Sequence, residues 1–161
     1  MAGVNATGTL ALIVEDDPAT RALEEEVLEA DGFAVLTARN GDDGIRLACE
    51  RRPAVILLDL ALPTASGFDV LEALKSSPAT MNIPVVVISA YVMLVENCVS
   101  RGASACVQKP FDIDDLVMQV RQALKMGKPA GTQGTNLCVD ARRLDSPSVA
   151  GHSRSSGPGI P

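Results

Sequence analysis

The sequence lacks tryptophan and is poor in aromatic residues, with one tyrosine and three phenylalanines among 161 residues. Valine, leucine, isoleucine and alanine therefore supply most of the hydrophobic residues, which make up 47% of the chain. Aliphatic residues suit strands that are covered on both faces, as in parallel sheets. A chain of this length can also bury a core without disulfides or a structural metal. The composition therefore favours an α/β fold over an antiparallel sandwich.

Recognisable metal and redox motifs are absent as well. The four cysteines, at positions 49, 98, 106 and 138, show no C-x-x-C spacing, and the single histidine, His152, lies in a polar segment. This pattern indicates neither a zinc site nor a redox dithiol. We expect buried, reduced thiols.

The sequence has no excess of positive charge and no long apolar run. Its net charge is −6 and its pI is about 4.7, which argues against direct binding to nucleic acid or anionic lipid. The longest apolar run, 85–95, is shorter than a bilayer span, and residues 1–10 lack the basic start of a secretion signal. We therefore expect a cytoplasmic protein without a direct nucleic-acid or membrane partner.

Short aliphatic runs alternate with longer amphipathic stretches between residues 9 and 125, which is the pattern of repeated strand-helix units and a parallel sheet. The expected strands are 10–14, 34–37, 54–58, 85–88 and 105–107. The expected helices are 18–31, 42–50, 68–75, 92–101 and 112–124. Residues 1–8 are expected to be a flexible N-terminus, and 126–161 a disordered tail, because glycine, serine and proline replace periodic apolar residues there. The sequence thus predicts one domain over 9–125.

The first helix has clear start and stop signals. Asp17 can cap it, Pro18 suits its first position, and Gly32 suits its end. Its predicted core face consists of Leu23, Val27 and Ala30.

Polar residues follow the carboxyl ends of the expected strands, where ligands bind in doubly wound sheets. They are Glu15, Asp16, Asp17, Asp59, Ser89 and Lys109. Taken singly, Asp17 is better explained as a helix cap, Ser89 as a strand-end hydroxyl and Lys109 as a surface cation. Asp59 differs because it lies inside an apolar run, where a carboxylate is costly without partners. Together these residues predict one polar crevice.

This set of side chains supports phosphorylation of an aspartate. A carboxylate can attack phosphorus when a cation neutralises the charge on the transferring oxygens, and Mg²⁺ suits carboxylate, water and phosphate ligands. We expect Asp16 and Asp59 to bind Mg²⁺ directly, and Glu15 directly or through water. The backbone carbonyl of Ala61 could complete the set.

The phosphoryl group would meet two further side chains. Lys109 would place a charge on one phosphate oxygen, and the Ser89 hydroxyl would donate to another. Without a metal the carboxylates repel one another, so at least one of their pKa values should be raised.

Four short motifs at these positions resemble those of a response-regulator receiver domain of two-component signalling. They are Leu-Ile-Val-Glu-Asp-Asp-Pro at 12–18, Val-Ile-Leu-Leu-Asp-Leu-Ala-Leu-Pro at 55–63 with Ser-Gly-Phe at 66–68, Pro-Val-Val-Val-Ile-Ser-Ala at 84–90 and Lys-Pro-Phe at 109–111. The resemblance covers about 9–125. It implies an α/β, doubly wound, flavodoxin-like fold, with five parallel strands in the order 2-1-3-4-5 and helices on both faces. It also implies a cis peptide bond before Pro110.

The resemblance further implies the function. Asp59 would accept a phosphoryl group from a histidine kinase or phosphotransfer protein, with Glu15 and Asp16 in the metal pocket, Ser89 sensing the phosphate and Lys109 as the family's lysine. The protein would be a switch and not an enzyme acting on other substrates. The fourth helix, fifth strand and fifth helix would signal to an unidentified output protein, and are a candidate homodimer surface. The chain shows no output domain, so it is a stand-alone receiver or a fragment.

Two features depart from the family pattern. Receivers usually carry Tyr or Phe three residues before the lysine, where this chain has Cys106, which puts the usual aromatic relay in doubt. The expected helix 92–101 is also unusually apolar. Its residues either pack onto the sheet, which we favour, or form a patch for a partner.

Two other functions use related folds. A phosphatase or phosphotransferase of the haloacid-dehalogenase kind would need a second aspartate two residues after the nucleophile, and that position is Ala61. A flavin or nucleotide carrier would need an anion-binding loop after the first strand. The loop here is Glu-Asp-Asp-Pro, which repels anions and has no glycines.

Overall fold

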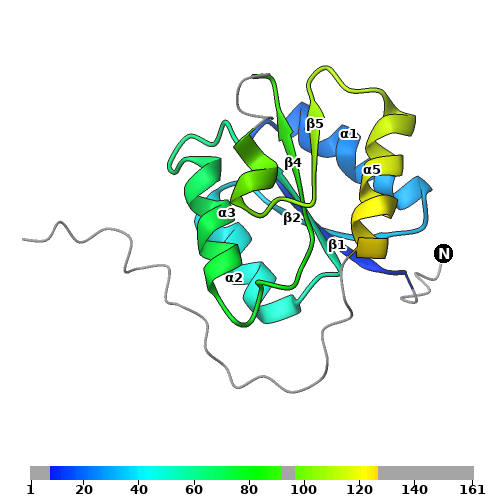
Figure 1. Cartoon of the computed structure of the whole chain (residues 1–161). Coiled ribbons are helices and arrows are strands. Elements are labelled where there is room, and N and C mark those ends of the chain that lie inside the picture. The colour runs from blue at the N-terminus through cyan, green and yellow to red at the C-terminus, as the bar shows by residue number, and fades with distance from the viewer. Residues whose placement is uncertain (1–7, 92–96, 127–161) are drawn as a thin grey trace, which may run out of the picture.

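The computed structural model describes residues 8–91 and 97–126, which form a five-stranded sheet with helices on both faces (Figure 1). In chain order the elements are β1 (Leu10–Val14), α1 (Pro18–Ala30), β2 (Ala34–Ala38), α2 (Gly41–Arg51), β3 (Val55–Asp59), α3 (Gly67–Ser76), β4 (Val85–Ser89), η1 (Val99–Arg101), β5 (Ala105–Gln108) and α5 (Ile113–Met126). All paired strands are parallel, in the order β2-β1-β3-β4-β5. The expected fold class and strand order are confirmed.

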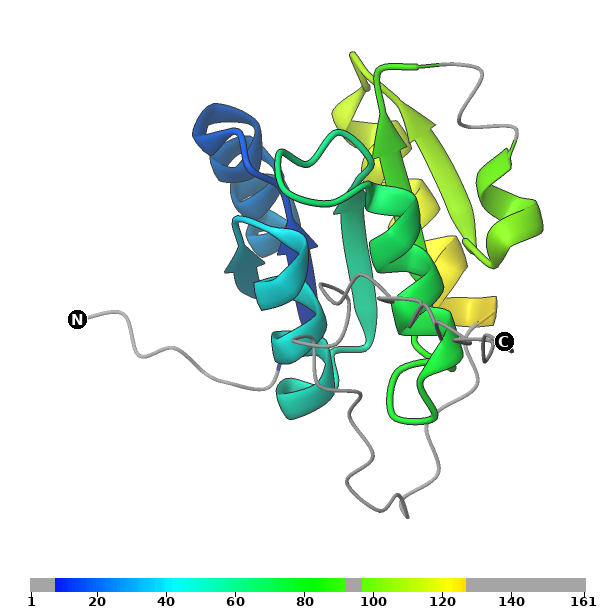
Figure 2. The ribbon, with the colours of Figure 1, turned by 90° about the vertical axis from the view of Figure 1, so that its left-hand side faces the viewer.

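Side chains of each central strand alternate between two hydrophobic clusters. In β3, Ile56 and Leu58 join the cluster under α2 and α3, whereas Val55 and Leu57 join the one under α1 and α5. Figure 2 shows α2 and α3 in front of the strands and α5 behind them. Because β3 is covered on both sides, all five of its residues are buried, Asp59 included.

Helix α1 begins as its signals predict but turns a different face to the core. Asp17 is the N-cap, its carboxylate accepting the Thr20 amide, and Pro18 opens the helix. The predicted core face is wrong at two positions, because Leu23 is 43% exposed and Ala30 is exposed. The buried residues are Glu24, Val27 and Leu28, which share the i, i+3, i+4 stripe. A carboxylate therefore occupies a core position of this helix.

Several sequence expectations concern segments beyond the described residues. The expected fourth helix lies partly there, over 92–96; its described end is η1, followed by Gly102 with a left-handed φ of 98°. The expected flexible N-terminus, 1–8, and disordered tail, 126–161, also lie outside the described residues, except for Gly8 and for Met126, which is the last residue of α5. They stay predictions. Of the helices described, none is long and apolar enough to cross a membrane.

Candidate functional site

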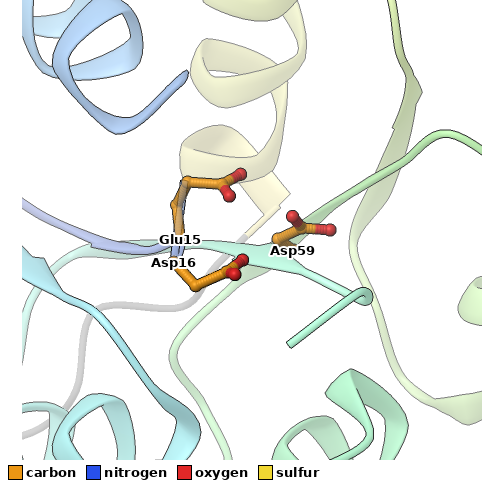
Figure 3. Close-up of side chains that lie close together, drawn as sticks. All are labelled: Glu15, Asp16 and Asp59. Atoms are coloured by element: carbon orange, nitrogen blue, oxygen red, sulfur yellow. The ribbon is translucent and has the colours of Figure 1, made fainter. Parts of the chain in front are cut away.

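Three carboxylates meet at the carboxyl ends of β1 and β3. Carboxylate oxygens of Glu15, Asp16 and Asp59 lie within 4.8 Å of one another, and the three groups face the same space in Figure 3. The sheet register explains this, because Val14 of β1 is aligned with Leu58 of β3, and an acidic residue follows each. Glu15 and Asp59 are buried, and Asp16 is the more accessible. Clustered hard oxygen donors of this kind suit a divalent metal ion.

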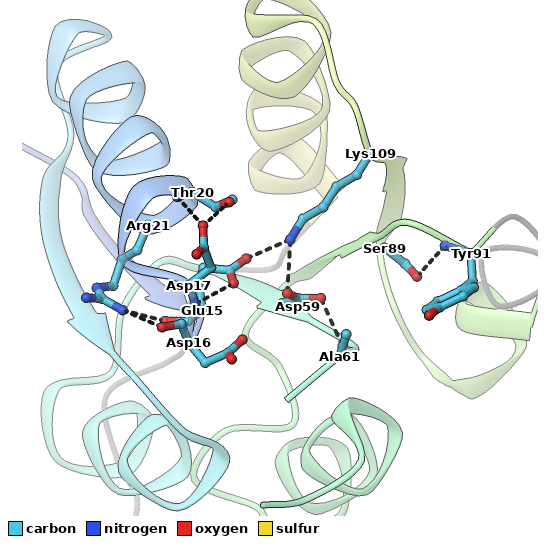
Figure 4. A network of polar contacts seen from close by, with 10 residues as sticks. All are labelled: Glu15, Asp16, Asp17, Thr20, Arg21, Asp59, Ala61, Ser89, Tyr91 and Lys109. Atoms are coloured by element: carbon cyan, nitrogen blue, oxygen red, sulfur yellow. Dashed lines mark hydrogen bonds and ion pairs between the residues drawn. The ribbon is translucent and has the colours of Figure 1, made fainter. Parts of the chain in front are cut away.

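Lys109 places one positive charge against two of these three carboxylates. Its Nζ lies 2.8 Å from Oε2 of Glu15 and 3.0 Å from Oδ2 of Asp59, bridging the two buried carboxylates (Figure 4). Burial acts to lower the pKa of Lys109, but its hydrogen bonds to the carboxylates outweigh burial and the pKa is raised. Lys109 therefore stays charged, and it belongs to the pocket.

The pKa of Glu15 is raised, chiefly because burial disfavours the charged form. The hydrogen bond from Lys109 and the backbone N–H of Asp17 act in the opposite direction, and the charge of Asp59 adds to the rise. One carboxylate in the cluster thus has a raised pKa, as expected, but desolvation contributes more than mutual repulsion.

The turn after β3 holds Asp59 in place. The Ala61 N–H donates to Oδ1 of Asp59 at 2.9 Å, and the Leu60 N–H donates to the Ile88 carbonyl of β4. Gly67 packs so closely here that an added Cβ would lie 2.6 Å from the Asp59 carbonyl oxygen. Both oxygens of the Asp59 carboxylate therefore have a donor, Ala61 on one side and Lys109 on the other.

Arg21 holds the loop that carries the other two carboxylates. One Nη of Arg21, in the second turn of α1, donates to the backbone carbonyls of Glu15 at 2.9 Å and Asp16 at 3.2 Å (Figure 4). This residue was not among the site residues expected from the sequence. The sequence does carry a signal for it. Arg21 lies one helical turn after the N-cap Asp17, and from there a long side chain can reach back to the backbone of the loop.

Ser89 lies at the end of β4, and its side chain is buried. Its hydroxyl oxygen accepts the Tyr91 N–H at 3.1 Å, and its carbonyl accepts the Lys109 N–H at 2.8 Å. The peptide bond between Lys109 and Pro110 is cis, as the family resemblance implies. Ser89 thus borders the pocket from β4, with its hydroxyl engaged by the Tyr91 amide (Figure 4).

Glu24 is a second residue that the sequence pattern did not single out. Its side chain is 1% exposed on the core face of α1, and its Oε1 has no hydrogen-bond partner within the described part of the chain. Burial, with a smaller contribution from the charge of Glu15, raises the pKa of Glu24 to about 8. At neutral pH this carboxyl is mostly protonated.

Comparisons with known proteins agree with this arrangement. The family model described as "Response regulator receiver domain" matches residues 11–121. The polar-differentiation response regulator DivK of Brucella anthropi is 32% identical over 115 residues, covering 70% of this chain and 94% of its own length. The dual master transcriptional regulator RpaA of Synechocystis, named as DNA-binding, is 35% identical over 116 residues, covering 71% of this chain. This chain spans only 48% of RpaA.

Solved structures of receiver domains are similar as well. The CheY-like receiver domain protein of Methanospirillum hungatei has a TM-score of 0.69 and 26% identity, covering 75% of this chain and 97% of that one. The receiver domain of the sensor histidine kinase PA1611 of Pseudomonas aeruginosa, solved with a magnesium ion coordinated in its active-site cleft, has a TM-score of 0.68 and 25% identity, covering 73% and 98%. With the family model matched over most of the chain, this protein belongs to the response regulator receiver domain family of two-component systems.

Proposed function

We propose that Asp59 is the phosphoacceptor of this receiver and that a histidine kinase or a phosphotransfer protein supplies the phosphoryl group. The supporting observation is the position of Asp59, a buried carboxylate at the end of β3 whose two oxygens are held by Lys109 and the Ala61 N–H. A carboxylate oxygen of Asp59 attacks phosphorus, the bond to the donor's imidazole nitrogen breaks, and an acyl phosphate forms.

We propose Mg²⁺ as the metal of the acidic cluster, because carboxylates are its usual protein ligands. Asp16 and Asp59 would hold it, with Glu15 binding directly or through water and the Ala61 carbonyl as a further ligand. When bound, the ion supplies charge neutralisation for the transferring phosphoryl oxygens. Lys109 has a separate role: its ammonium, now 3.0 Å from Oδ2 of Asp59, would pair with a phosphate oxygen.

Ser89 would report the phosphate to the rest of the domain. Its hydroxyl is the side-chain group at the end of β4 and now bonds to the Tyr91 amide. Donation to a phosphate oxygen would turn the hydroxyl and change the backbone position after β4. The surface formed by residues 97–101, β5 and α5 would then present a changed face to an output protein or to a second copy of the chain.

We propose that the protein is a signalling switch in the cytoplasm, not an enzyme acting on a separate substrate. Ala61 supports this, since a phosphatase of the haloacid-dehalogenase kind would need a general acid at that position. For the output, the expectation of no nucleic-acid partner has no support, because relatives such as RpaA are named as DNA-binding regulators. The net charge of −6 argues only against nucleic-acid binding by this chain itself, not by an output partner.

Intact-mass spectrometry after incubation with acetyl phosphate tests the proposal. The wild type should gain one phosphoryl group with Mg²⁺ present and none with excess chelator. Asp59→Asn keeps the side-chain shape without the nucleophile and should gain none, whereas Asp69→Asn, at an exposed carboxylate of α3, should behave as wild type. Equal labelling of Asp59→Asn and wild type would reject Asp59 as the acceptor.

A further inference from the structure

Two cysteines that are eight positions apart in the sequence lie side by side in the fold. Cys98 precedes η1, and the chain turns back at Gly102, where the Ala103 N–H donates to the Cys98 carbonyl at 3.0 Å. Cys106 lies in β5, aligned with Val87 of β4. Its side chain packs against the core cluster that contains Cys98, and the two thiols are near enough for each to shift the other's pKa. The spacing of the cysteines in the sequence does not reveal this pair.

The two thiols differ in access to solvent. Cys98 is fully buried, whereas Cys106 is only partly buried, at the edge of the sheet formed by β5. Cys49 is buried in α2, away from the pair in the sequence and in a different element. A small reagent should therefore reach Cys106 first, with Cys98 as the thiol behind it.

We propose that Cys98 and Cys106 are an oxidisable pair that forms an intramolecular disulfide by exchange with a small-molecule disulfide such as oxidised glutathione. Cys106 loses its proton to solvent and attacks one sulfur of the reagent, whose S–S bond breaks and releases one glutathione thiolate. Cys98, deprotonated in turn, attacks the Cys106 sulfur of the mixed disulfide and releases the second glutathione. Two protein thiols are oxidised and one reagent disulfide is reduced to two thiols.

The surroundings of the pair make this reaction slow at neutral pH. Burial raises the pKa of Cys106 to about 12, and the neighbouring Cys98 adds to the rise. Burial also raises the pKa of Cys98, while Cys106 and the charge of Arg101 act against it. Because the thiolate is the reacting form, the rate should increase about tenfold with each pH unit while the pH stays below these pKa values. The disulfide would therefore form under sustained oxidation and not under brief oxidation.

A disulfide here would tie the segment before η1 to β5. This consequence rests on the proposed function, because residues 97–101 and β5 belong to the surface proposed to signal. Cys106 lies three residues before Lys109, about 10 Å along an extended strand, so the phosphorylation pocket would stay intact. Oxidation should thus leave phosphoryl acceptance by Asp59 unchanged and restrain the response of the surface.

Non-reducing peptide mapping of the full-length protein, after long incubation with oxidised glutathione at pH 8.5, tests the pair. We expect a monomer that has lost two hydrogens in mass, with a peptide linking Cys98 to Cys106. The link should be absent from Cys106→Ser and Cys98→Ser and present in the control Cys49→Ala. A melting curve for each variant identifies those that fold. Labelling with acetyl phosphate is measured separately, so that a failure to form the disulfide can be distinguished from a failure to phosphorylate Asp59.

Three results would overturn the proposal: glutathione that remains attached to Cys106 as a stable mixed disulfide, a link from either cysteine to Cys49 or Cys138, and thiols that stay reduced in the folded wild type after incubation at pH 9.5. An oxidation rate that does not increase between pH 7.5 and 8.5 would also contradict the thiolate mechanism.

Discussion

The Nζ of Lys109 lies 3.0 Å from Oδ2 of Asp59, although the two residues are 50 positions apart: Asp59 is the last residue of β3, and Lys109 directly follows β5. The same ammonium lies 2.8 Å from Glu15, so a single cation stabilises two buried carboxylates. Lys109 therefore contributes to the stability of the metal-free protein in addition to its proposed contact with phosphate.

Lys109→Ala should destabilise the metal-free protein, because it leaves Glu15 and Asp59 buried without their cation. We expect a loss of about 1–3 kcal/mol, since the lysine is partly exposed and water can replace some of its contacts. Urea unfolding at neutral pH in excess chelator measures this loss, with Lys125→Ala, at an exposed lysine of α5, as the control. Equal midpoints for both variants would show that the ion pairs contribute nothing.

Mg²⁺ should stabilise the folded protein because it binds a site that the unfolded chain lacks. At a concentration one hundred times the dissociation constant, the expected gain is about 2.7 kcal/mol. Asp16→Asn should remove most of this gain, and Asp42→Asn, at an exposed carboxylate of α2, should keep it. Thermal melting with increasing Mg²⁺ is the measurement. A gain of the same size in Asp16→Asn would place the ion elsewhere.

Arg21 should position the acidic loop for metal binding. Arg21→Ala removes both hydrogen bonds to the loop carbonyls, so the loop becomes less ordered and Mg²⁺ affinity should fall several-fold. Arg21→Lys keeps a donor and should restore part of the affinity, a rescue that general destabilisation would not produce. Titration calorimetry at one pH compares the three proteins. If Arg21→Ala binds Mg²⁺ as tightly as the wild type, Arg21 does not position the loop.

Glu24 should make stability depend on pH. Its pKa in the folded protein is about 8, above its usual value of 4.5, so the folded state binds more protons than the unfolded state between these two pH values. Stability should therefore fall as the pH rises from about 5 to 8, by about 1.4 kcal/mol per pH unit at most. Glu24→Gln should flatten this dependence, and Glu26→Gln, on the same helix outside its buried stripe, should not. Urea midpoints at pH 5, 7 and 9 measure it.

The fold was predictable because its signals are local. Aliphatic runs of strand length, the Asp17-Pro18 start of α1 and the acidic residues at strand ends each act over a few residues, and parallel topology then brings strand ends to one edge. The meeting of Glu15, Asp16 and Asp59 follows from this rule.

The residues that were missed depend on packing. The rotation of α1 about its axis decides that Glu24 faces the core and Leu23 faces solvent, and a pattern of leucines and alanines alone does not determine it. Arg21 reaches the loop through a long side chain, and Cys98 meets Cys106 only because the turn at Gly102 folds the chain back. These contacts are tertiary and leave no regular spacing in the sequence.

The most direct test of the proposed function is to identify the residue that carries the phosphoryl group. The protein would be phosphorylated with acetyl phosphate and Mg²⁺, reduced with borohydride to convert the aspartyl phosphate to homoserine, and mapped by peptide mass spectrometry. We predict homoserine at position 59, with no such mark in protein that received no phosphoryl donor. A mark at Asp16 or at another residue, with position 59 unmodified, would contradict the assignment of Asp59 as the phosphoacceptor.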